Sequence, residues 1–260
     1  MKLKIAGCSG TSVRETFLTT FCVNDVVLLD AGAATSGLTL PEQARITDVF
    51  LSHPHLDHVG DLLFLADNLV ELICQDHCDT VMINGTAPVL DAVRTHLLNN
   101  TVWPDFTAIP PQCPVLRLEP MAFGEARTVQ GLAVTALPVN HGPGACGFVL
   151  REMETGASLA YTGDTGVCAA WWEALDALET PIENVIVECS FPNSLEGLAH
   201  ASRHLTPALL AAEVARLSHR PRLFISHMKH TFAGRIIKEL QAALEGWDLH
   251  FLRQGGVLHL

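Results

Sequence analysis

The stretch Leu51-Ser52-His53-Pro54-His55-Leu56-Asp57-His58 follows the largely apolar run 46–51 and holds three histidines and one aspartate within six residues. Neutral imidazole and carboxylate oxygen are ligands for zinc and other divalent first-row metals. Side chains two residues apart share a side in an extended backbone, so His53 and His55 are placed to bind one ion, while Asp57 and His58 face a second. A histidine-rich surface loop is the alternative. The stretch lies between a buried strand and a helix, where α/β proteins usually carry their sites.

Four further polar residues stand where a predicted strand ends, and each has a side chain suited to metal binding or proton transfer. Any one of them alone is more often a capped turn or a surface group, but together they supply what the opening stretch lacks. They are His141 after strand 131–137, Asp164 after strand 158–161, Glu188 at the end of strand 185–187 and His227 after strand 223–226.

Most of these residues divide into ligand sets for two ions that share one carboxylate. A bridging carboxylate fixes two metals about 3.5–4 Å apart, as in two-metal hydrolytic sites, and the pair lowers the pKa of a shared water toward neutrality. We predict Zn²⁺, although Mn²⁺ or Fe²⁺ suits the same ligands. The predicted sets are His53, His55 and His141 for one ion and Asp57, His58 and His227 for the other, with Asp164 bridging both.

Length and charge limit the classes of function. The 260 residues include 48% hydrophobic ones, and with no linker or low-complexity segment we predict one domain over 1–260. The formal net charge of −12 argues against binding to extended nucleic acid, because few basic side chains are available to neutralise phosphates. A small phosphorylated substrate is compatible with this charge, since two divalent ions would add about four positive charges at the site.

The eight cysteines and the N-terminal residues bear on the compartment. No stretch reaches the run of about 20 apolar residues that a membrane helix needs, and residues 1–10 lack the apolar segment of a signal peptide. We therefore predict reduced thiols in a cytoplasmic protein. Cys74 and Cys78 invite a zinc interpretation, but no second pair follows at a suitable distance, so the end of a helix is favoured.

The hydrophobic pattern predicts strands and helices along the whole chain. Two β-rich halves, each followed by helices, favour an α/β fold of two sheets face to face with helices outside. Strands are predicted at 2–8, 20–30, 46–51, 81–84, 115–118, 127–137, 147–151, 158–161, 185–187 and 223–226. Helices are predicted at 41–45, 59–74, 87–98, 169–178, 206–218 and 233–245.

Three other side chains leave two interpretations open. Asp30 follows strand 26–29 and either caps a turn or lies near the metals, and the cap is favoured. Trp103 and Phe106 precede a proline-rich connection. Their rings suit stacking on a nucleotide base or packing in the core, and packing is favoured.

Residues 53–58 match the HxHxDH motif of the metallo-β-lactamase superfamily, which the sequence resembles. His141, Asp164 and His227 match the later ligands of that superfamily in order and in local context. The resemblance implies a four-layer αββα sandwich, in the α/β (α+β) class, with a dinuclear and usually zinc-containing centre.

Within the superfamily, the chain resembles the class II cyclic-nucleotide phosphodiesterases over nearly its whole length. It departs from their pattern at His230, which follows Lys229 where proline is expected. The segments 99–106 and 188–193 are the most discriminating. The matching segments are 53–58, 99–106, 188–193, 204–207 and 226–229.

Glu188 and His204 also resemble the glutamate and the His-x-Thr element of the tRNA 3′-processing branch, where the histidine lies beside the scissile phosphate. Hydrolysis of a phosphodiester needs a proton on the departing alkoxide, and imidazole has a suitable pKa. Glu188 is placed to orient His204 and keep it protonated. Asp57, Glu188 and His204 are therefore the predicted catalytic residues, and two surface residues of a polar loop are the alternative for the Glu188 and His204 pair.

The combined prediction is a metal-dependent phosphodiesterase that opens 3′,5′-cyclic AMP (cAMP) or cyclic GMP (cGMP) to the 5′-monophosphate. A metal-bridging hydroxide would attack phosphorus in line, and His204 would protonate the 3′-oxygen. The predicted partner is thus a small cyclic nucleotide, with no membrane and no extended nucleic acid. The sequence does not fix the oligomeric state, and a homodimer is one option.

Three other functions compete with this prediction. An RNA 3′-processing nuclease of the same fold should carry a basic arm, and the net charge of −12 argues against one. Hydrolysis of a neutral ester, lactone or lactam is a second enzymatic alternative. A metal-binding or nucleotide-sensing module without catalysis is the third, and the complete ligand set argues against it.

Overall fold

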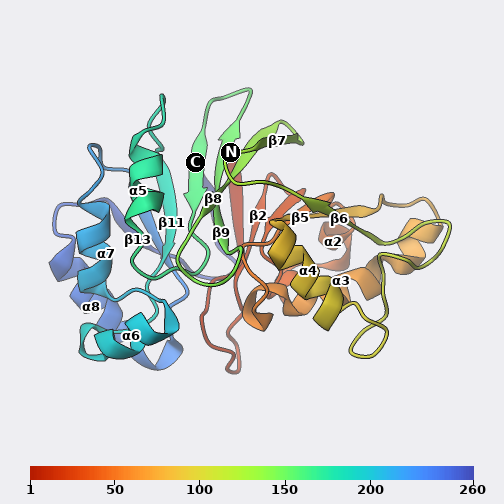
Figure 1. Cartoon of the computed structure of the whole chain (residues 1–260), viewed down its shortest axis with the longest axis horizontal. Coiled ribbons are helices and arrows are strands. Elements are labelled where there is room, and N and C mark those ends of the chain that lie inside the picture. Colours follow the sequence, from red (N-terminus) through yellow and green to blue (C-terminus); the bar gives the residue numbers. More distant parts are fainter.

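Two seven-stranded sheets lie face to face with helices on both outer sides in this computed structural model, which describes residues 1–260 (Figure 1). The predicted αββα sandwich is therefore confirmed. None of the helices is both long and apolar enough to cross a membrane.

The first sheet combines an antiparallel and a parallel half. Its order is β14 (Val257–His259), β1 (Lys2–Gly7), β2 (Thr20–Val23), β3 (Val27–Leu29), β4 (Asp48–Phe50), β5 (Val81–Gly85) and β6 (Leu116–Pro120). Strands β14 to β3 pair antiparallel, and β3 to β6 pair in parallel. The predicted strand 20–30 is in fact a hairpin, because Asn24 and Asp25 adopt left-handed backbone conformations that turn the chain.

The second sheet has the same plan. Its order is β13 (Leu249–Phe251), β12 (Arg222–Ser226), β11 (Asn184–Glu188), β10 (Ser158–Tyr161), β9 (Cys146–Glu152), β8 (Leu132–Pro138) and β7 (Ala126–Val129). Strands β7 to β10 pair antiparallel, and β10 to β13 pair in parallel. The predicted strand 127–137 is divided by a turn at Gln130 and Gly131, both with positive φ. The short edge strands β13 and β14 were not predicted.

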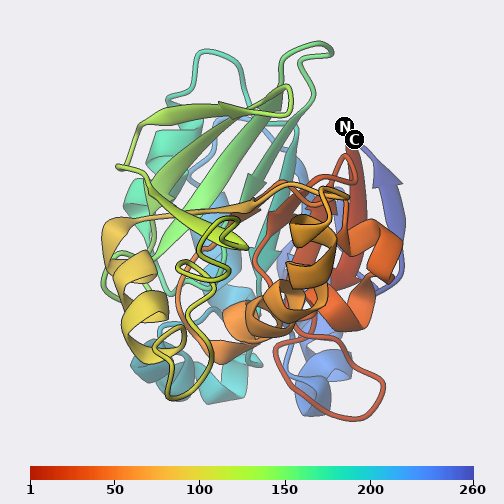
Figure 2. The same ribbon diagram turned by 90° about the vertical axis from the view of Figure 1, so that its right-hand side faces the viewer.

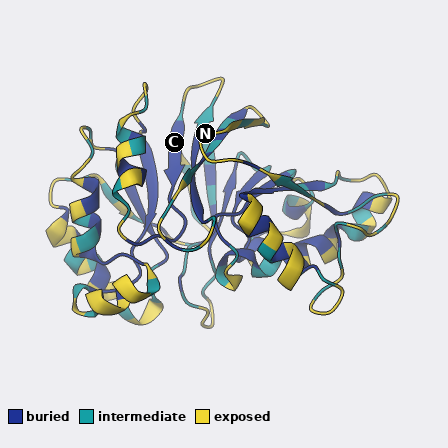
Figure 3. Cartoon of the chain, viewed as in Figure 1, coloured by how far each residue is buried: buried dark blue, intermediate teal, exposed yellow.

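Helices cover the outer faces of both sheets, and their outward sides are exposed while the sheets between them are buried (Figure 3). The helices beside the first sheet are α1 (Ala34–Gly37), α2 (Leu40–Gln43), α3 (Leu56–Cys74) and α4 (Ala87–His96). Those of the second half are α5 (Ala169–Asp176), α6 (Glu196–Ser202), α7 (Pro207–Val214) and α8 (Ala233–Ala243). Helices α1 and α6 were not predicted, and α7 ends four residues before the predicted end at 218.

Helix α3 begins three residues earlier than predicted, with His55 at its N-cap. Asp57 and His58 therefore lie in the first helical turn rather than in a preceding loop. A carboxylate in a first turn stabilises a helix by opposing the positive end of its dipole. The apolar stripe Val59, Leu62 and Ala66 then packs onto the first sheet, as the helical periodicity predicts.

The two inner faces form a core of buried aromatic and aliphatic side chains. Phe50 and Phe148 meet edge to face across it, with ring centroids 5.4 Å apart. Phe21 and Tyr161 do the same at 5.4 Å. This core packs the two sheets against each other, and the residues that follow β4 in one sheet and β10 in the other lie close together.

The chain ends lie side by side (Figure 2), because β14 pairs with β1. The amino group of Met1 donates a hydrogen bond to the carbonyl of Leu260 over 3.2 Å.

Candidate metal centre

Three of the metal-site residues predicted from the sequence follow the carboxyl ends of strands that pair in parallel. His53 lies just after β4, Asp164 follows β10, and His227 follows β12. Ligand sites in α/β folds lie at this edge. The structure brings all seven predicted ligands together in two adjoining groups, which are His53, His55 and His141, and Asp57, His58, Asp164 and His227. Within each group the ligand atoms lie within 4.8 Å of one another.

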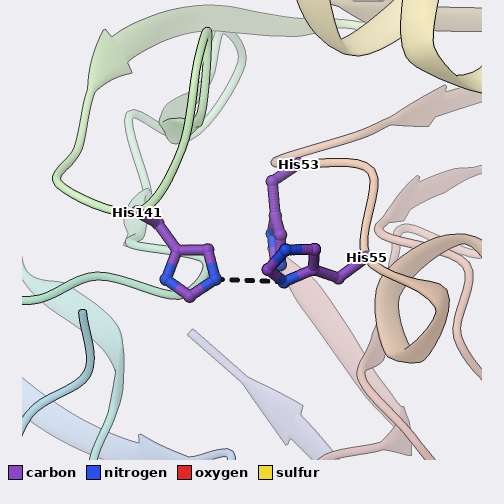
Figure 4. Close-up of side chains that lie close together, drawn as sticks. All are labelled: His53, His55 and His141. Carbon is purple, nitrogen blue, oxygen red and sulfur yellow. Dashed lines mark hydrogen bonds between the residues drawn. The ribbon is translucent and has the colours of Figure 1, made fainter. Parts of the chain in front are cut away.

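The first group consists of three imidazoles that converge from two loops (Figure 4). His53 and His141 are buried, whereas His55 is exposed at the mouth of the site. His141 Nε2 and His55 Nδ1 approach to 3.1 Å. Burial lowers the pKa of His53 well below its usual value, so its imidazole is neutral, which is the form that binds a metal.

The second group places two carboxylates between two imidazoles. His227 Nε2 lies 3.2 Å from Asp57 Oδ2 and 3.4 Å from Asp164 Oδ2, and His58 Nε2 lies 3.3 Å from Asp164 Oδ1. Burial opposes ionisation of Asp164, but the neighbouring His227 and His58 outweigh it and hold the pKa of this carboxyl well below its usual value. The ionised carboxylate is the form that binds a cation.

Asp164 belongs to both groups by distance. Its Oδ2 lies 3.7 Å from His53 Nε2 and 3.9 Å from His141 Nε2, in addition to its contacts with the second group. One carboxylate thus faces every buried histidine of the centre, as a bridging ligand must.

Three buried polar atoms of this cluster have no hydrogen-bond partner: His53 Nε2, His58 Nε2 and Asp164 Oδ1. Leaving a buried polar atom unpaired costs about 1–3 kcal/mol each. A cation bound between these atoms would satisfy all three at once. The donor set of imidazole and carboxylate is also the one that zinc, manganese and iron share. The residues present therefore fit a dinuclear metal centre.

Asp30 supports this centre from behind, so the favoured interpretation of a turn cap was wrong. Its side chain is fully buried, and its Oδ2 accepts hydrogen bonds from His58 Nδ1 (2.7 Å), Ser52 Oγ (2.7 Å) and Tyr161 Oη (2.5 Å). Because Nδ1 of His58 is held in this way, Nε2 points to the centre.

The other buried histidines are oriented by the same device. His53 Nδ1 donates to Ser52 Oγ over 2.9 Å, and His141 Nδ1 donates to the carbonyl of Arg203 over 2.9 Å. His227 Nδ1 lies 3.1 Å from Ser190 Oγ. In each ring Nε2 is left for the centre. These supporting residues were not predicted from the sequence, because a serine or a backbone carbonyl has no sequence pattern of its own.

His204 and Glu188 form a buried pair beside the two groups. His204 Nδ1 donates to Glu188 Oε1 over 2.7 Å, and Glu188 also accepts from Ser190 Oγ (2.8 Å) and the amide of Thr165 (3.0 Å). The alternative of two surface residues is wrong, since Glu188 is 2% and His204 8% exposed. Burial opposes a charge on His204, but the Glu188 carboxylate outweighs it and raises the pKa of the imidazole.

The position of His204 relative to the ligands is informative. Its ring centroid lies 5.0 Å from that of His141 and 5.6 Å from that of His227, on which it stacks. A ligand atom of His204 also lies within 4.8 Å of the ligand atoms of His141 and Asp164. With Nδ1 bound to Glu188, the Nε2–H of a protonated His204 is available to a molecule at the centre.

Lys229 has a structural contact. Its Nζ donates to the carbonyl of Gly10 over 2.6 Å and fixes the loop that joins β1 to β2. Gly10 in turn packs on the ring of His227, and a Cβ on Gly10 would lie 2.8 Å from His227 Nδ1.

The two aromatic residues near the proline-rich connection pack, as favoured. Phe106 is buried against α3, and Trp103 contacts Phe64 edge to face while its Nε1 donates to the carbonyl of Leu63. Cys74 is the last residue of α3, and Cys78 belongs to no group of metal ligands.

Comparisons with known proteins bear on the family to which the chain belongs. The profile of the β-lactamase superfamily domain matches residues 25–228. The 3′,5′-cyclic-nucleotide phosphodiesterase 1 of Saccharomyces cerevisiae is 25% identical in an alignment of 244 residues, which covers 80% of this chain and 64% of the yeast protein. This chain therefore spans less than two-thirds of that relative.

A second relative and a solved structure are similar to the chain over most of its length. The 3′,5′-cyclic-nucleotide phosphodiesterase of Aliivibrio fischeri is 25% identical over 249 aligned residues, covering 79% of this chain and 72% of that protein. The crystal structure of unliganded yeast PDE1 superposes with a TM-score of 0.84 at 19% identity, covering 100% of this chain and 99% of that one. At that identity the superposition establishes the fold.

Proposed function

The chain belongs to the metallo-β-lactamase superfamily, and we propose that within it the protein hydrolyses 3′,5′-cyclic nucleotides to 5′-monophosphates. We rest this proposal above all on the buried pair of His204 and Glu188 beside the metal-ligand groups. The alkoxide of a phosphodiester departs poorly unless it receives a proton. The negatively charged phosphate would also attract a protonated imidazole, whereas an amide or β-lactam ring carries no such charge.

The relatives supply the substrate class. Those from Saccharomyces cerevisiae and Aliivibrio fischeri carry the name 3′,5′-cyclic-nucleotide phosphodiesterase, and we extend that substrate to this chain. The net charge of −12 supports a small substrate over RNA, since binding along a polynucleotide depends on an array of basic side chains.

The proposed ligands of two divalent ions are His53, His55 and His141 for one and Asp57, His58 and His227 for the other, with Asp164 between them. Bound there, such ions would supply an activated water at neutral pH and offset the charge of the phosphate. We propose Zn²⁺ as the metal, because five of the seven ligands are histidines.

Three side chains of the protein would carry out the remaining steps, which are proton donation and the orientation of the reacting groups. His204 donates a proton from Nε2 to the departing 3′-oxygen, and Glu188 keeps His204 protonated and fixes its ring. The side chain of Asp57 is 29% exposed at the mouth. Its carboxylate can accept a hydrogen bond from the attacking water and so orient it toward phosphorus.

The test is product analysis with protein reconstituted separately with Zn²⁺, Mn²⁺ and Fe²⁺. We expect 5′-AMP or 5′-GMP from cAMP or cGMP, and a His204→Ala variant should lose about 10²–10⁴-fold in kcat while retaining its metal content. His200→Ala is the matched control, since this exposed histidine lies on α6 and pairs only with Glu196.

Failure of all three reconstituted forms to release a 5′-monophosphate would overturn the proposal. Cleavage of a precursor tRNA, or of an ester or lactone, in the absence of cyclic-nucleotide turnover would assign the same site to another substrate. Tight binding of cAMP without turnover would indicate a sensor.

A further inference from the structure

Two thiols from distant parts of the chain meet on the outer side of the first sheet. Cys74 is the last residue of α3, and Cys113 lies in the connection 97–115 between α4 and β6. Their Sγ atoms are 3.3 Å apart, and both cysteines are free. No other two of the eight cysteines are in hydrogen-bond contact.

We propose that Cys74 and Cys113 are a thiol-oxidation site, which forms a reversible disulfide by exchange with low-molecular-weight disulfides such as oxidised glutathione. A disulfide needs about 2.05 Å between its sulfurs. The two Sγ atoms therefore have to close by little more than about 1 Å, which rotation of two accessible side chains about χ1 provides.

The backbone holds both thiols in place. The amide of Gln75 donates to the carbonyl of Glu71, so the helix is intact up to Cys74. The amide of Cys113 donates to the carbonyl of Pro110, and that of Val115 donates to Ile109. The contact thus joins two ordered segments.

Several of the remaining thiols are poor competitors for this oxidation. Cys22 is buried, and burial raises its pKa to about 12, while burial raises that of Cys8 to about 11. Thiols of this kind are unreactive because the thiolate is the nucleophile. Cys78 is the one alternative close in sequence, and it is half-buried against the core around α3.

The exchange balances in two steps. The thiolate of Cys74 attacks one sulfur of oxidised glutathione, which forms a mixed disulfide and releases one glutathione. The thiolate of Cys113 then attacks the Cys74 sulfur and releases the second. Two protein thiols are oxidised, one small disulfide is reduced, and the two protons go to the departing thiolates.

The crosslink would close a loop between residues 39 positions apart, including β5 and α4. Such a link stabilises mainly by restricting the unfolded chain, so we expect the melting temperature to rise by about 5 °C or more. The metal-ligand end of α3 lies 16 to 17 residues away, about 25 Å along the helix. Catalysis should therefore be unchanged, and this inference stands independently of the proposed function.

The experiment treats the metal-loaded full chain with oxidised glutathione at mildly alkaline pH. We expect a loss of two titratable thiols, a peptide that joins Cys74 to Cys113 in mass spectra, and reversal by dithiothreitol. Cys74→Ser and Cys113→Ser should abolish the joined peptide and the rise in melting temperature. Cys78→Ser is the matched control and should retain both.

If a variant fails to fold, mapping of the disulfide bonds in the oxidised wild-type protein by mass spectrometry decides the outcome. A bond from Cys74 to Cys78, a bond between two chains, or glutathione that stays on Cys74 without an internal bond would each overturn the proposal.

Discussion

Glu188→Gln tests the role of the negative charge that Glu188 places beside His204. The amide keeps the size of the carboxylate, and its oxygen can still accept from His204 Nδ1, now 2.7 Å from Glu188 Oε1. A hydrogen bond to a charged partner contributes about 1.5–3 kcal/mol and a neutral one about 0.5–1.5 kcal/mol. The protonated imidazole should therefore lose about 1–1.5 kcal/mol of stabilisation.

The sign of the effect follows from the role of His204 as a proton donor. The Glu188 carboxylate raises the pKa of His204, so the substitution lowers it. A general acid works while protonated, and its rate falls as pH rises through its pKa. We expect the alkaline limb of the kcat/KM profile for cAMP to move to lower pH. The rates should differ about tenfold on that limb and converge below both pKa values.

The assay is kcat/KM against pH at saturating metal, with Glu196→Gln as the control. Glu196 also lies beside a histidine, His200, but that pair is about half exposed on α6. The control should leave the profile unchanged. A uniform loss for Glu188→Gln at every pH, with no displacement of the alkaline limb, would refute the idea that Glu188 acts by holding the proton.

Metal removal and substitutions at Asp30 and Gly10 probe the centre and the residues that support it, with Gly60 as a comparison. Removal of metal by a chelator should abolish turnover and lower the melting temperature, because three buried ligand atoms then lack partners. Added Zn²⁺ should restore both. Activity that persists after elemental analysis shows complete removal of the metal would contradict the metal assignment. Asp30→Ala removes the acceptor of His58 Nδ1 and should weaken metal affinity about 10–100-fold in a chelator competition, with unchanged affinity as the contrary result. Gly10→Ala places a Cβ 2.4 Å from the carbonyl of His227 and should destabilise by about 1–3 kcal/mol in urea unfolding. Gly60→Ala meets nothing within 4 Å on α3 and should instead stabilise by about 0.5–1 kcal/mol, so equal effects of the two would argue against the packing explanation.

The short-range pattern of the sequence was enough to predict which polar side chains gather at the site. His53 to His58 form one local motif, and His141, Asp164 and His227 each follow a recognisable strand. The αββα architecture rested on a resemblance, since apolar runs alone do not specify how two sheets stack. Turns inside long apolar runs were missed, because Asn24 and Asp25 or Gln130 and Gly131 divide a run without lowering its β-propensity much.

The residues that hydrogen-bond to the ligands could not be predicted without the order of the strands in the sheet, which local sequence does not contain. Asp30 follows β3, and it reaches His58 because β3 pairs in parallel with β4. The backbone at Asp30, Arg203 and His227 is left-handed, with φ of 56° to 57°, although none of the three is glycine. Such conformations cost energy and persist only where the surrounding contacts hold them, and here those contacts are the ones that aim the histidines.

The pairing of β14 with β1 also determines how the molecule can be tethered. Strand β1 runs in the same direction as β3, so its first residue lies at the edge of the sheet opposite to the carboxyl ends that carry the ligands, and β14 ends beside it. A tag, a surface linker or a fused partner attached to either Met1 or Leu260 would leave from that opposite edge. The mouth of the centre would then face away from the support and stay open to substrate.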